Sequence, residues 1–166
     1  ESDTGEVPEK TAEELFRHAC NLEHAARAFI KLKTGGFGAL YPDVVLVGER
    51  RNDTTVLPSY PFAGTSGRYL FNALDLVGVT SYKIHVTNAI KDDNSPMRRE
   101  EIIFLRGERT KFVALGEVAD YTLTKLDEPH SRAPHPQFRW RFHHHQLAEY
   151  GRQIYDAAFS EARYTP

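Results

Sequence analysis

The sequence has one cysteine, Cys20, among its 166 residues, and that scarcity excludes several kinds of protein. A single thiol cannot build an internal disulfide framework, nor can it supply the cysteines of a zinc ribbon or an iron–sulfur cluster. Long apolar runs are missing too: no segment approaches the roughly 20 residues of a membrane span, and no secretory signal pattern is present. We therefore expect an intracellular protein, cytoplasmic in a prokaryotic or viral setting, with no membrane partner.

An excess of positive charge is also missing, which excludes a protein that coats DNA through a broadly basic surface. Lysine and arginine total 21 against 23 aspartate and glutamate, giving a formal net charge of −2. The average hides an asymmetry, since residues 1–14 are mostly acidic and residues 130–145 contain no acid. The later stretch combines three arginines and five histidines with three aromatic residues, a composition that suits a local contact with DNA.

Sequence patterns for phosphate, metal and nucleophile sites are absent as well. There is no Gly-x-Gly-x-x-Gly or Walker loop for a nucleotide, no Gly-x-Ser-x-Gly elbow for a serine hydrolase, and no His-Glu-x-x-His or Cys-x-x-Cys spacing for zinc. His143, His144 and His145 are consecutive. On a helix they would point about 100° apart, so they cannot share one ion. We expect no cofactor and no metal cluster.

Apolar periodicity predicts alternating strands and helices in a single domain over residues 1–166, with a flexible acidic tail over 1–10. The β-α-β-α order predicts a three-layer α/β/α fold around a central four-stranded parallel sheet. In such sheets ligands bind beyond the carboxyl ends of the strands. We expect strands over 43–48, 83–90, 111–116 and near 130–136, and helices over 11–33, 66–77, 97–106, 117–126 and 144–162.

Four short motifs place polar or aromatic side chains near these strand ends. Glu49 follows a glycine that ends the first strand, and Phe62 precedes two glycines at the start of a helix. Asn88 lies at the end of the second strand, and His135 is held between two prolines. Each has an ordinary structural interpretation as a capping carboxylate, a buried aromatic, a loop-capping amide or a surface histidine. Together they also offer a carboxylate, a stacking ring, an amide that reads a base edge and a rigid hydrogen-bond donor.

In their order and spacing the motifs resemble the uracil-DNA glycosylase superfamily, and most closely its family IV. That family reads roughly Gly-Glu-Ala-Pro-Gly, Pro-Phe-Val-Gly-x-Ala-Gly-x-Leu-Leu, Ile-Thr-Asn-x-x-Lys, a Leu-Gly strand end and His-Pro-Ser. The resemblance covers about residues 43–140. The matching segments here are Gly48-Glu49, Pro61-Phe62-Ala63-Gly64-Thr65-Ser66-Gly67-Arg68-Tyr69-Leu70, Val86-Thr87-Asn88-Ala89-Ile90-Lys91, Leu115-Gly116 and His135-Pro136.

The resemblance implies a monomeric DNA glycosylase, which flips a non-standard pyrimidine out of DNA, hydrolyses its N-glycosidic bond and leaves an abasic site. It implies that Glu49 activates water and that Phe62 stacks on the base. It further implies that Asn88 reads the base edge and that His135 stabilises the departing base anion. We expect the pocket rim or the contacts to the DNA backbone to include Arg50, Arg51, Asn52, Gly64, Ser66, Gly67, Lys91, Gln137, Arg139, Trp140 and Arg141.

The chain departs from family IV around the expected base pocket. The cluster cysteines are missing, since Cys20 lies in an apolar helix pattern and is expected in the core. Arg50-Arg51-Asn52 replaces Ala-Pro-Gly, and Gln137 replaces the serine after His-Pro. The base is therefore open between uracil and a 5-modified pyrimidine. Removal of hypermodified viral bases, such as glucosylated hydroxymethylcytosine, would be an antiviral activity rather than repair.

Two further interpretations stay open on the sequence. The altered loop after Glu49 permits a catalytically silent relative that only binds DNA or a protein partner. The same chemistry would also suit hydrolysis of free nucleosides or nucleotides. The arginine- and aromatic-rich stretch over 138–142 favours DNA, because a bare nucleosidase does not require it.

Overall fold

A computed structural model describes residues 30–31, 36–39, 41–50, 65–79, 84–143 and 145–159 of the chain. Most of the first expected helix, Cys20 and the acidic tail lie outside these residues. At the end of that helix the prediction is wrong, because Ile30–Lys31 form a strand, β1. No helix of the described part of the chain is long and apolar enough to cross a membrane.

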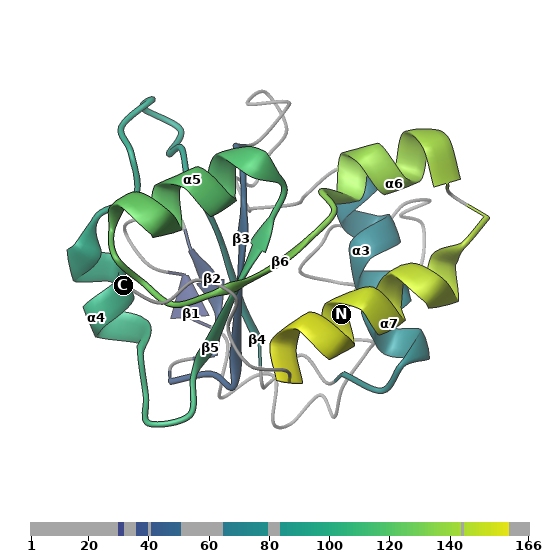
Figure 1. Ribbon diagram of the computed structural model, residues 1–166, viewed down its shortest axis with the longest axis horizontal. Helices are drawn as coiled ribbons and strands as arrows, with labels where there is room; N and C mark the ends of the chain where they lie inside the picture. Colours follow the sequence, from purple (N-terminus) through teal and green to yellow (C-terminus); the bar gives the residue numbers. More distant parts are fainter. Residues whose placement is uncertain are drawn as a thin grey trace, which may run out of the picture.

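Strands and helices alternate along the described residues, which confirms the α/β prediction (Figure 1). The helices expected over 66–77, 97–106, 117–126 and 144–162 correspond to four helices of the described residues, of which α7 begins at Leu147 instead of His144. The weak strand signal near residues 130–136 corresponds to β6. The strands are β1 (Ile30–Lys31), β2 (Phe37–Gly38), β3 (Val44–Gly48), β4 (Ile84–Asn88), β5 (Lys111–Leu115) and β6 (Ser131–Ala133). The helices are α3 (Thr65–Leu76), α4 (Arg99–Leu105), α5 (Glu117–Lys125), α6 (Pro136–His143) and α7 (Leu147–Phe159).

The sheet is larger than the four parallel strands that the sequence predicts. In the described residues it has six strands in the order β1-β2-β4-β3-β5-β6. The four strands β4, β3, β5 and β6 are parallel, whereas β2 pairs antiparallel with β4, and β1 antiparallel with β2. Gly38 has a φ of +139°, and a Cβ there would collide with the carbonyl oxygen of Ile84. Glycine therefore lets β2 approach the edge of β4.

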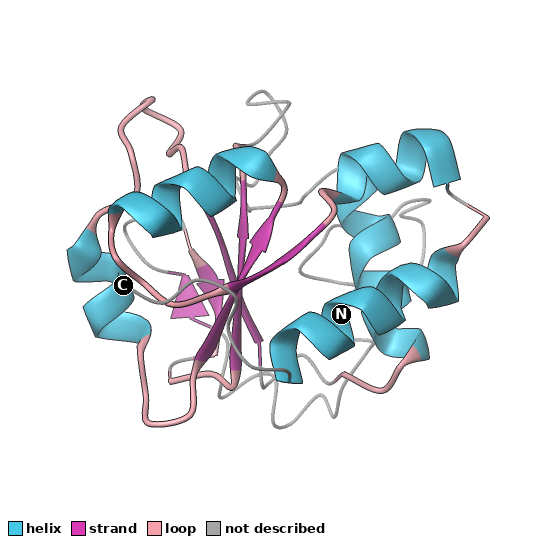
Figure 2. Cartoon of the chain, in the orientation of Figure 1, coloured by secondary structure: helices cyan, strands magenta, loops and turns pink. Residues whose placement is uncertain are grey.

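Helices pack against both faces of the sheet (Figure 2). Successive strand residues point to opposite faces. On β3, Val44 and Leu46 join a core with α3 and α7, whereas Val45 and Val47 join a second core with α4 and α5. Because both faces are covered, all five residues of β3 are buried. This burial explains why the strand reads as a continuous apolar run rather than an alternating one.

Helices α3 and α7 lie close together because α7 has a glycine at their contact. Gly151 of α7 is buried, and a Cβ there would collide with the backbone carbonyl of Ala73 on α3. Nearby, the rings of Tyr69 and Tyr150 stack with centroids 5.6 Å apart. The fully buried Tyr150 also donates a hydrogen bond from its hydroxyl to the carbonyl of Pro134, 2.7 Å away. Helix α7 is thereby tied to the segment that follows β6.

Helix α6 was not expected from the sequence. Pro136 occupies its first position, where a missing backbone N–H and a fixed φ are favourable. The histidines, arginines and aromatic residues of this stretch show no clear apolar stripe, so periodicity could not predict a helix there. The consequence is that the residues after His135 form an ordered helix instead of an irregular loop.

The helices that follow the neighbouring strands β3 and β5 pack on opposite faces of the sheet. Helix α3, which follows β3, covers one face, whereas α5, which follows β5, covers the other. The carboxyl ends of the neighbouring strands β3 and β5 are therefore a point at which the following helices change from one face of the sheet to the other. Ligands bind at such a switch point in open α/β sheets.

Candidate active site

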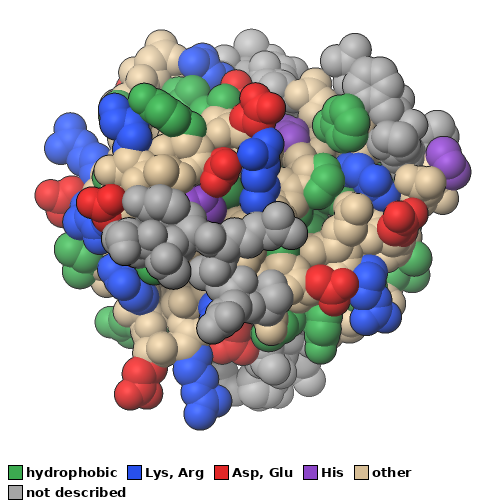
Figure 3. All heavy atoms as spheres, in the orientation of Figure 1, with side chains coloured by type: hydrophobic (Ala, Val, Ile, Leu, Met, Phe, Trp, Pro, Cys, Tyr) green, Lys and Arg blue, Asp and Glu red, His purple; other side chains and the backbone are tan. Residues whose placement is uncertain are grey.

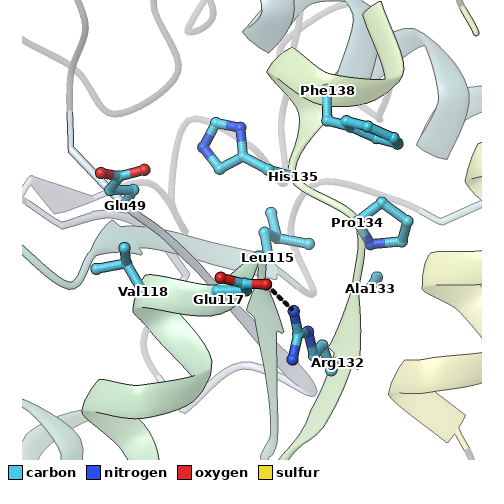
Figure 4. Close-up of a pocket in the computed structure, with 10 residues that line it drawn as sticks. Glu49, Leu115, Glu117, Val118, Arg132, Ala133, Pro134, His135 and Phe138 are labelled. Carbon is cyan, nitrogen blue, oxygen red and sulfur yellow. Dashed lines mark ion pairs between the residues drawn. The ribbon is translucent and has the colours of Figure 1, made fainter. Parts of the chain in front are cut away.

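A cavity of about 620 Å³ lies at the carboxyl ends of β3, β5 and β6. It is within the size range that accommodates small-molecule ligands, roughly 300–1,000 Å³. Ten of the described residues line it, and Figure 4 shows how they lie. They are Glu49, Leu115, Gly116, Glu117, Val118, Arg132, Ala133, Pro134, His135 and Phe138.

Glu49 is the first residue after β3, and its exposed side chain faces the cavity. Its backbone is held from the neighbouring strand: the N–H of Ile90 donates to the carbonyl of Glu49 at 2.8 Å. One residue earlier, the N–H of Ala89 donates to the carbonyl of Gly48 at the same distance. The parallel ladder thus continues past the strand end and fixes the position from which the carboxylate extends.

His135 lies on the other side of the cavity, in the two-residue link between β6 and α6. The backbone N–H of Gln137 donates to its Nδ1 at 3.0 Å. Since Nδ1 accepts, the neutral ring carries its proton on Nε2. Burial lowers the pKa of His135, and the negative charge of Glu49 opposes that shift. The neutral ring is therefore the form that prevails at pH 7, with one donor at Nε2.

Gly116 makes room for His135. It directly follows β5 with a φ of +100°, and a Cβ there would lie 3.2 Å from the Cβ of His135. Its N–H donates to the carbonyl of Ala133 at 2.9 Å, which joins the ends of β5 and β6. Both the backbone conformation and the close approach require glycine here.

The ion pair between Arg132 and Glu117 lies along the lower side of the cavity in Figure 4. The guanidinium of Arg132 donates to Asp120 Oδ2 at 3.1 Å and lies 3.8 Å from the carboxylate of Glu117. Behind it, the buried His130 contacts Asp120 Oδ1 through Nε2 at 2.6 Å and the carbonyl of Glu128 through Nδ1 at 2.7 Å. Asp120 thus contacts both His130 and Arg132 and holds Arg132 at the cavity edge.

The structure places other residues of the predicted site away from the cavity surface. Asn88 is only 8% exposed at the end of β4, beside Gly48 in the strand register, and it does not line the cavity. Lys91 lies 2.6 Å from the buried carboxylate of Glu101 and donates to Thr87 Oγ1 at 2.8 Å. Arg50 is exposed and donates to Asn94 Oδ1 at 3.0 Å.

Arg139 was expected on a basic surface but lies inside the molecule. It is only 6% exposed, and its guanidinium lies 5.5 Å from the centre of the Tyr150 ring. It also donates to the carbonyl of Gln146 at 3.4 Å. Cation–π contact with a buried ring compensates in part for removing this charge from water. Arg139 therefore joins α6 to α7 and does not reach DNA in this arrangement.

The remaining predicted residues are only partly described. Phe62, Arg51, Asn52 and Gly64 lie outside the described residues. Trp140 and Arg141 belong to α6, and Ser66 to the first turn of α3, but their side chains are not among those described. Gly67 is buried within α3, and Gln137 contributes its backbone N–H to His135.

The lining residues that were not predicted include Glu117, Val118, Arg132 and Phe138. Glu117 and Val118 follow the predicted strand end at Leu115 and Gly116, and that position was the available signal. Arg132 and Phe138 flank His135 in the acid-free stretch, which was singled out only as a general DNA contact. Their place in the cavity depends on the length of β6 and on the unexpected helix α6.

Within the part of the chain that the structure describes, no group of three or more His, Cys, Asp or Glu side chains could hold a metal ion. In comparisons with known proteins, no family model matches the chain and no curated protein matches it. Chemically, the cavity offers a carboxylate and a neutral imidazole donor from different strand ends. This pair can activate a water molecule and stabilise a leaving group that becomes negative.

Proposed function

We propose that this chain is a DNA glycosylase that hydrolyses the N-glycosidic bond of a non-standard pyrimidine, either uracil or a 5-modified base. The observation that carries the proposal is that Glu49 and His135 line one cavity while the backbone of Gln137 occupies His135 Nδ1. This arrangement leaves Nε2 as the donor. In this proposal the domain has the α/β/α layering of the uracil-DNA glycosylase superfamily and acts on DNA as a monomer.

The proposed reaction is a hydrolysis at C1′ of the deoxyribose. The Glu49 carboxylate accepts a proton from water as the water oxygen bonds to C1′, and it stabilises the positive charge that develops on the sugar. The bond between C1′ and the base nitrogen breaks, and its electron pair leaves with the base. The Nε2–H of His135 donates to the pyrimidine O2, where the negative charge accumulates.

Base access in this proposal requires the nucleotide to leave the stack, because both side chains lie at the mouth of the sheet and cannot reach into a duplex. Asn88 is proposed to read the base edge from the end of β4 and Phe62 to stack on the ring. The rim residues then act on substrate choice. The cavity extends beyond Glu49 and His135 toward Phe138 and Arg132, which supports a substrate larger than a single pyrimidine ring.

The test is base release from oligonucleotides that contain uracil, an unmodified sequence or glucosylated hydroxymethylcytosine, read as strand scission at abasic sites after alkali. Glu49→Gln should lower the release rate by about 10²- to 10⁴-fold, because the amide cannot accept the proton from water. Glu108→Gln is the matched control: Glu108 is exposed in the turn before β5, at the opposite edge of the sheet. Release at the parental rate by Glu49→Gln would contradict the mechanism, and release only from glucosylated DNA would favour the antiviral role.

A second candidate, hydrolysis of a free nucleoside, is favoured by the charges at the cavity. Among the described residues that line it, two exposed carboxylates, Glu49 and Glu117, accompany one guanidinium, that of Arg132. The expected cations Lys91 and Arg139 are engaged elsewhere. A neutral nucleoside, which has no phosphates to neutralise, suits such a lining, whereas a DNA strand bound there would depend on contacts with its bases. The test is chromatography of uracil released from free deoxyuridine and from a uracil-containing oligonucleotide. Release from the nucleoside but not from the oligonucleotide would favour this second function.

A further inference from the structure

The cavity has two ends with different chemistry. At one end are the carboxylate of Glu49 and the imidazole of His135. At the other are the ring of Phe138, the ring of Pro134 and the Arg132–Glu117 pair. Figure 4 shows His135 between Glu49 and Phe138, with its ring directed toward the Glu49 side. Bond cleavage uses only the first end, so the aromatic end is left for contacts with a further part of the substrate.

Phe138 presents an aromatic ring at a fixed place. It lies in the first turn of α6 and is 49% exposed, although it lines the cavity. The helix start is anchored, because the N–H of Arg139 donates to the carbonyl of His135 at 3.2 Å. Since an aromatic side chain has few rotatable bonds, stacking of a planar group on this ring costs little conformational entropy. Planar bases stack on such platforms whatever their sequence.

Polar groups line the same cavity as this ring. Arg132 provides N–H donors, and its guanidinium is held by Asp120 at 3.1 Å. Glu117 provides carboxylate acceptors and is 88% exposed. Arginine and glutamate side chains are the types that pair with the donor and acceptor edges of bases. The aromatic end therefore combines a stacking face with groups that suit a base edge.

The charges around the cavity favour a contact with bases over a grip on phosphates. Among the described side chains that line it, Glu49 and Glu117 outnumber Arg132. The coloured atoms on the face in Figure 3 likewise show acidic and basic side chains interspersed. Affinity for a duplex depends largely on neutralising phosphates, whereas affinity for unpaired bases depends strongly on stacking.

We propose that the aromatic end of the cavity is a subsite for the unpaired base next to the target nucleotide, so that the preferred substrate is single-stranded DNA. Phe138 stacks on the neighbouring base, and Arg132 with Glu117 contacts its edge. The inference rests on the proposed function, because it assigns a substrate class to the same site. It requires that the neighbouring base be unpaired and unstacked, which a single strand allows at little cost.

The experiment uses fluorescein-labelled oligonucleotides with one deoxyuridine, in which the adjacent nucleotide carries either a base or a tetrahydrofuran spacer without a base. We expect kcat/KM of the parental protein to fall about tenfold with the spacer on one side, mainly through KM, as stacking energies predict. Phe138→Ala should lose about the same factor on the intact strand and be insensitive to the spacer. Phe138→Tyr should retain the parental values, and Phe159→Ala, which removes an exposed ring on α7, is the control.

Several outcomes would overturn the subsite. Equal rates with and without the spacer would remove its basis. Preference for duplex DNA, with Phe138→Ala affecting only the duplex, would show that the ring enters the helix stack instead. If no oligonucleotide loses uracil, the proposed function fails by itself. Fluorescence anisotropy of the same strands then decides the subsite, because binding must still weaken with the spacer and with Phe138→Ala.

Discussion

The backbone N–H of Gln137 donates a hydrogen bond to Nδ1 of His135 at 3.0 Å, so a peptide group, not a side chain, determines which ring nitrogen carries the proton. Because this N–H lies in the first turn of α6, it has no partner within the helix and can serve the imidazole. The unexpected helix is therefore what orients the proposed donor toward the cavity.

Removal of this N–H should impair the reaction while leaving the side chains of the site intact. Gln137→Pro removes the backbone N–H at this position, and proline is tolerated in the first turn of a helix. Without this donor, both tautomers of His135 become accessible. We expect base release to fall about tenfold, since the tautomer with the proton on Nδ1 has no donor at Nε2. Gln137→Ala keeps the N–H and should match the parental protein in the same assay. A loss in Gln137→Ala equal to that in Gln137→Pro would assign the effect to the side chain.

The activity should fall on acidification with an apparent pKa below the ordinary value for histidine. Burial lowers the pKa of His135, and the Glu49 charge only partly opposes this, so the ring stays neutral through pH 7 and protonates below the usual range near 6.5. Protonation of Nδ1 then breaks its bond from Gln137. The measurement is kcat/KM against pH. His135→Gln, which cannot titrate, should lose that acidic limb and much of the rate; an unchanged limb would place the titrating group elsewhere.

Gly116 should be intolerant of a side chain for a reason that can be separated from backbone strain. Gly116→Ala incurs the cost of a backbone conformation that is essentially restricted to glycine, about 1–3 kcal/mol, and also presses on the Cβ of His135. Gly78 is the matched control, because its φ is +79° and a Cβ there meets nothing within 4 Å. Both alanine variants should unfold at lower urea concentration, but only Gly116→Ala should lose base release. Equal activity in the two variants would show that His135 adjusts freely.

Acid should destabilise the fold through the buried His85. Its side chain donates from Nδ1 to the carbonyl of Ala39 at 3.0 Å, and burial lowers its pKa from 6.5 to about 4. The unfolded chain binds a proton below pH 6.5 while the folded chain does not until about pH 4, so stability is lost across that window. The expected loss is about 3 kcal/mol. Urea unfolding at pH 7 and at pH 4.5 measures it, and His85→Gln should show a weaker dependence on pH. A parental dependence that is identical in His85→Gln would assign it to other groups.

Lys91 should contribute to stability rather than to DNA affinity. Its ammonium lies 2.6 Å from Glu101, which is only 3% exposed, so Lys91→Met leaves a buried carboxylate without its partner. The expected loss is about 3–5 kcal/mol in the free energy of unfolding, and the double variant Lys91→Met with Glu101→Gln should recover part of it. If Lys91 contacts phosphate instead, the salt dependence of DNA binding should weaken by about one unit of slope.

The parallel core of the sheet was predictable because its residues obey simple rules. The run of Val44 to Val47 is apolar on both faces, and Gly48 marks its end, so strand and cavity edge follow from the sequence. The strands β1 and β2 were not predictable, because two residues carry no periodicity. They form only where Gly38 allows a close approach to β4.

The candidate site was predictable only where a strand end dictated it. Glu49 directly follows β3, and His135 lies two residues after β6. Because β3 and β6 belong to the parallel part of the sheet, both residues lie at the same edge and line one cavity. The expected position of Arg139 was wrong, because an arginine in a basic stretch is usually exposed, whereas here its guanidinium packs over the buried ring of Tyr150. The contact of Glu117 with Arg132 depends on the packing of α5 beside β6, which sequence spacing does not reveal.

The hydroxyl of Tyr150 donates to the carbonyl of Pro134, immediately before His135, from a side chain that is fully buried in α7. Burial raises the pKa of this phenol well above its ordinary value of 10.0. The hydroxyl therefore keeps its proton throughout the range in which enzymes are usually assayed. Since this tether to α7 does not titrate, changes of rate with pH report on the ring it positions and not on a loosening of its support.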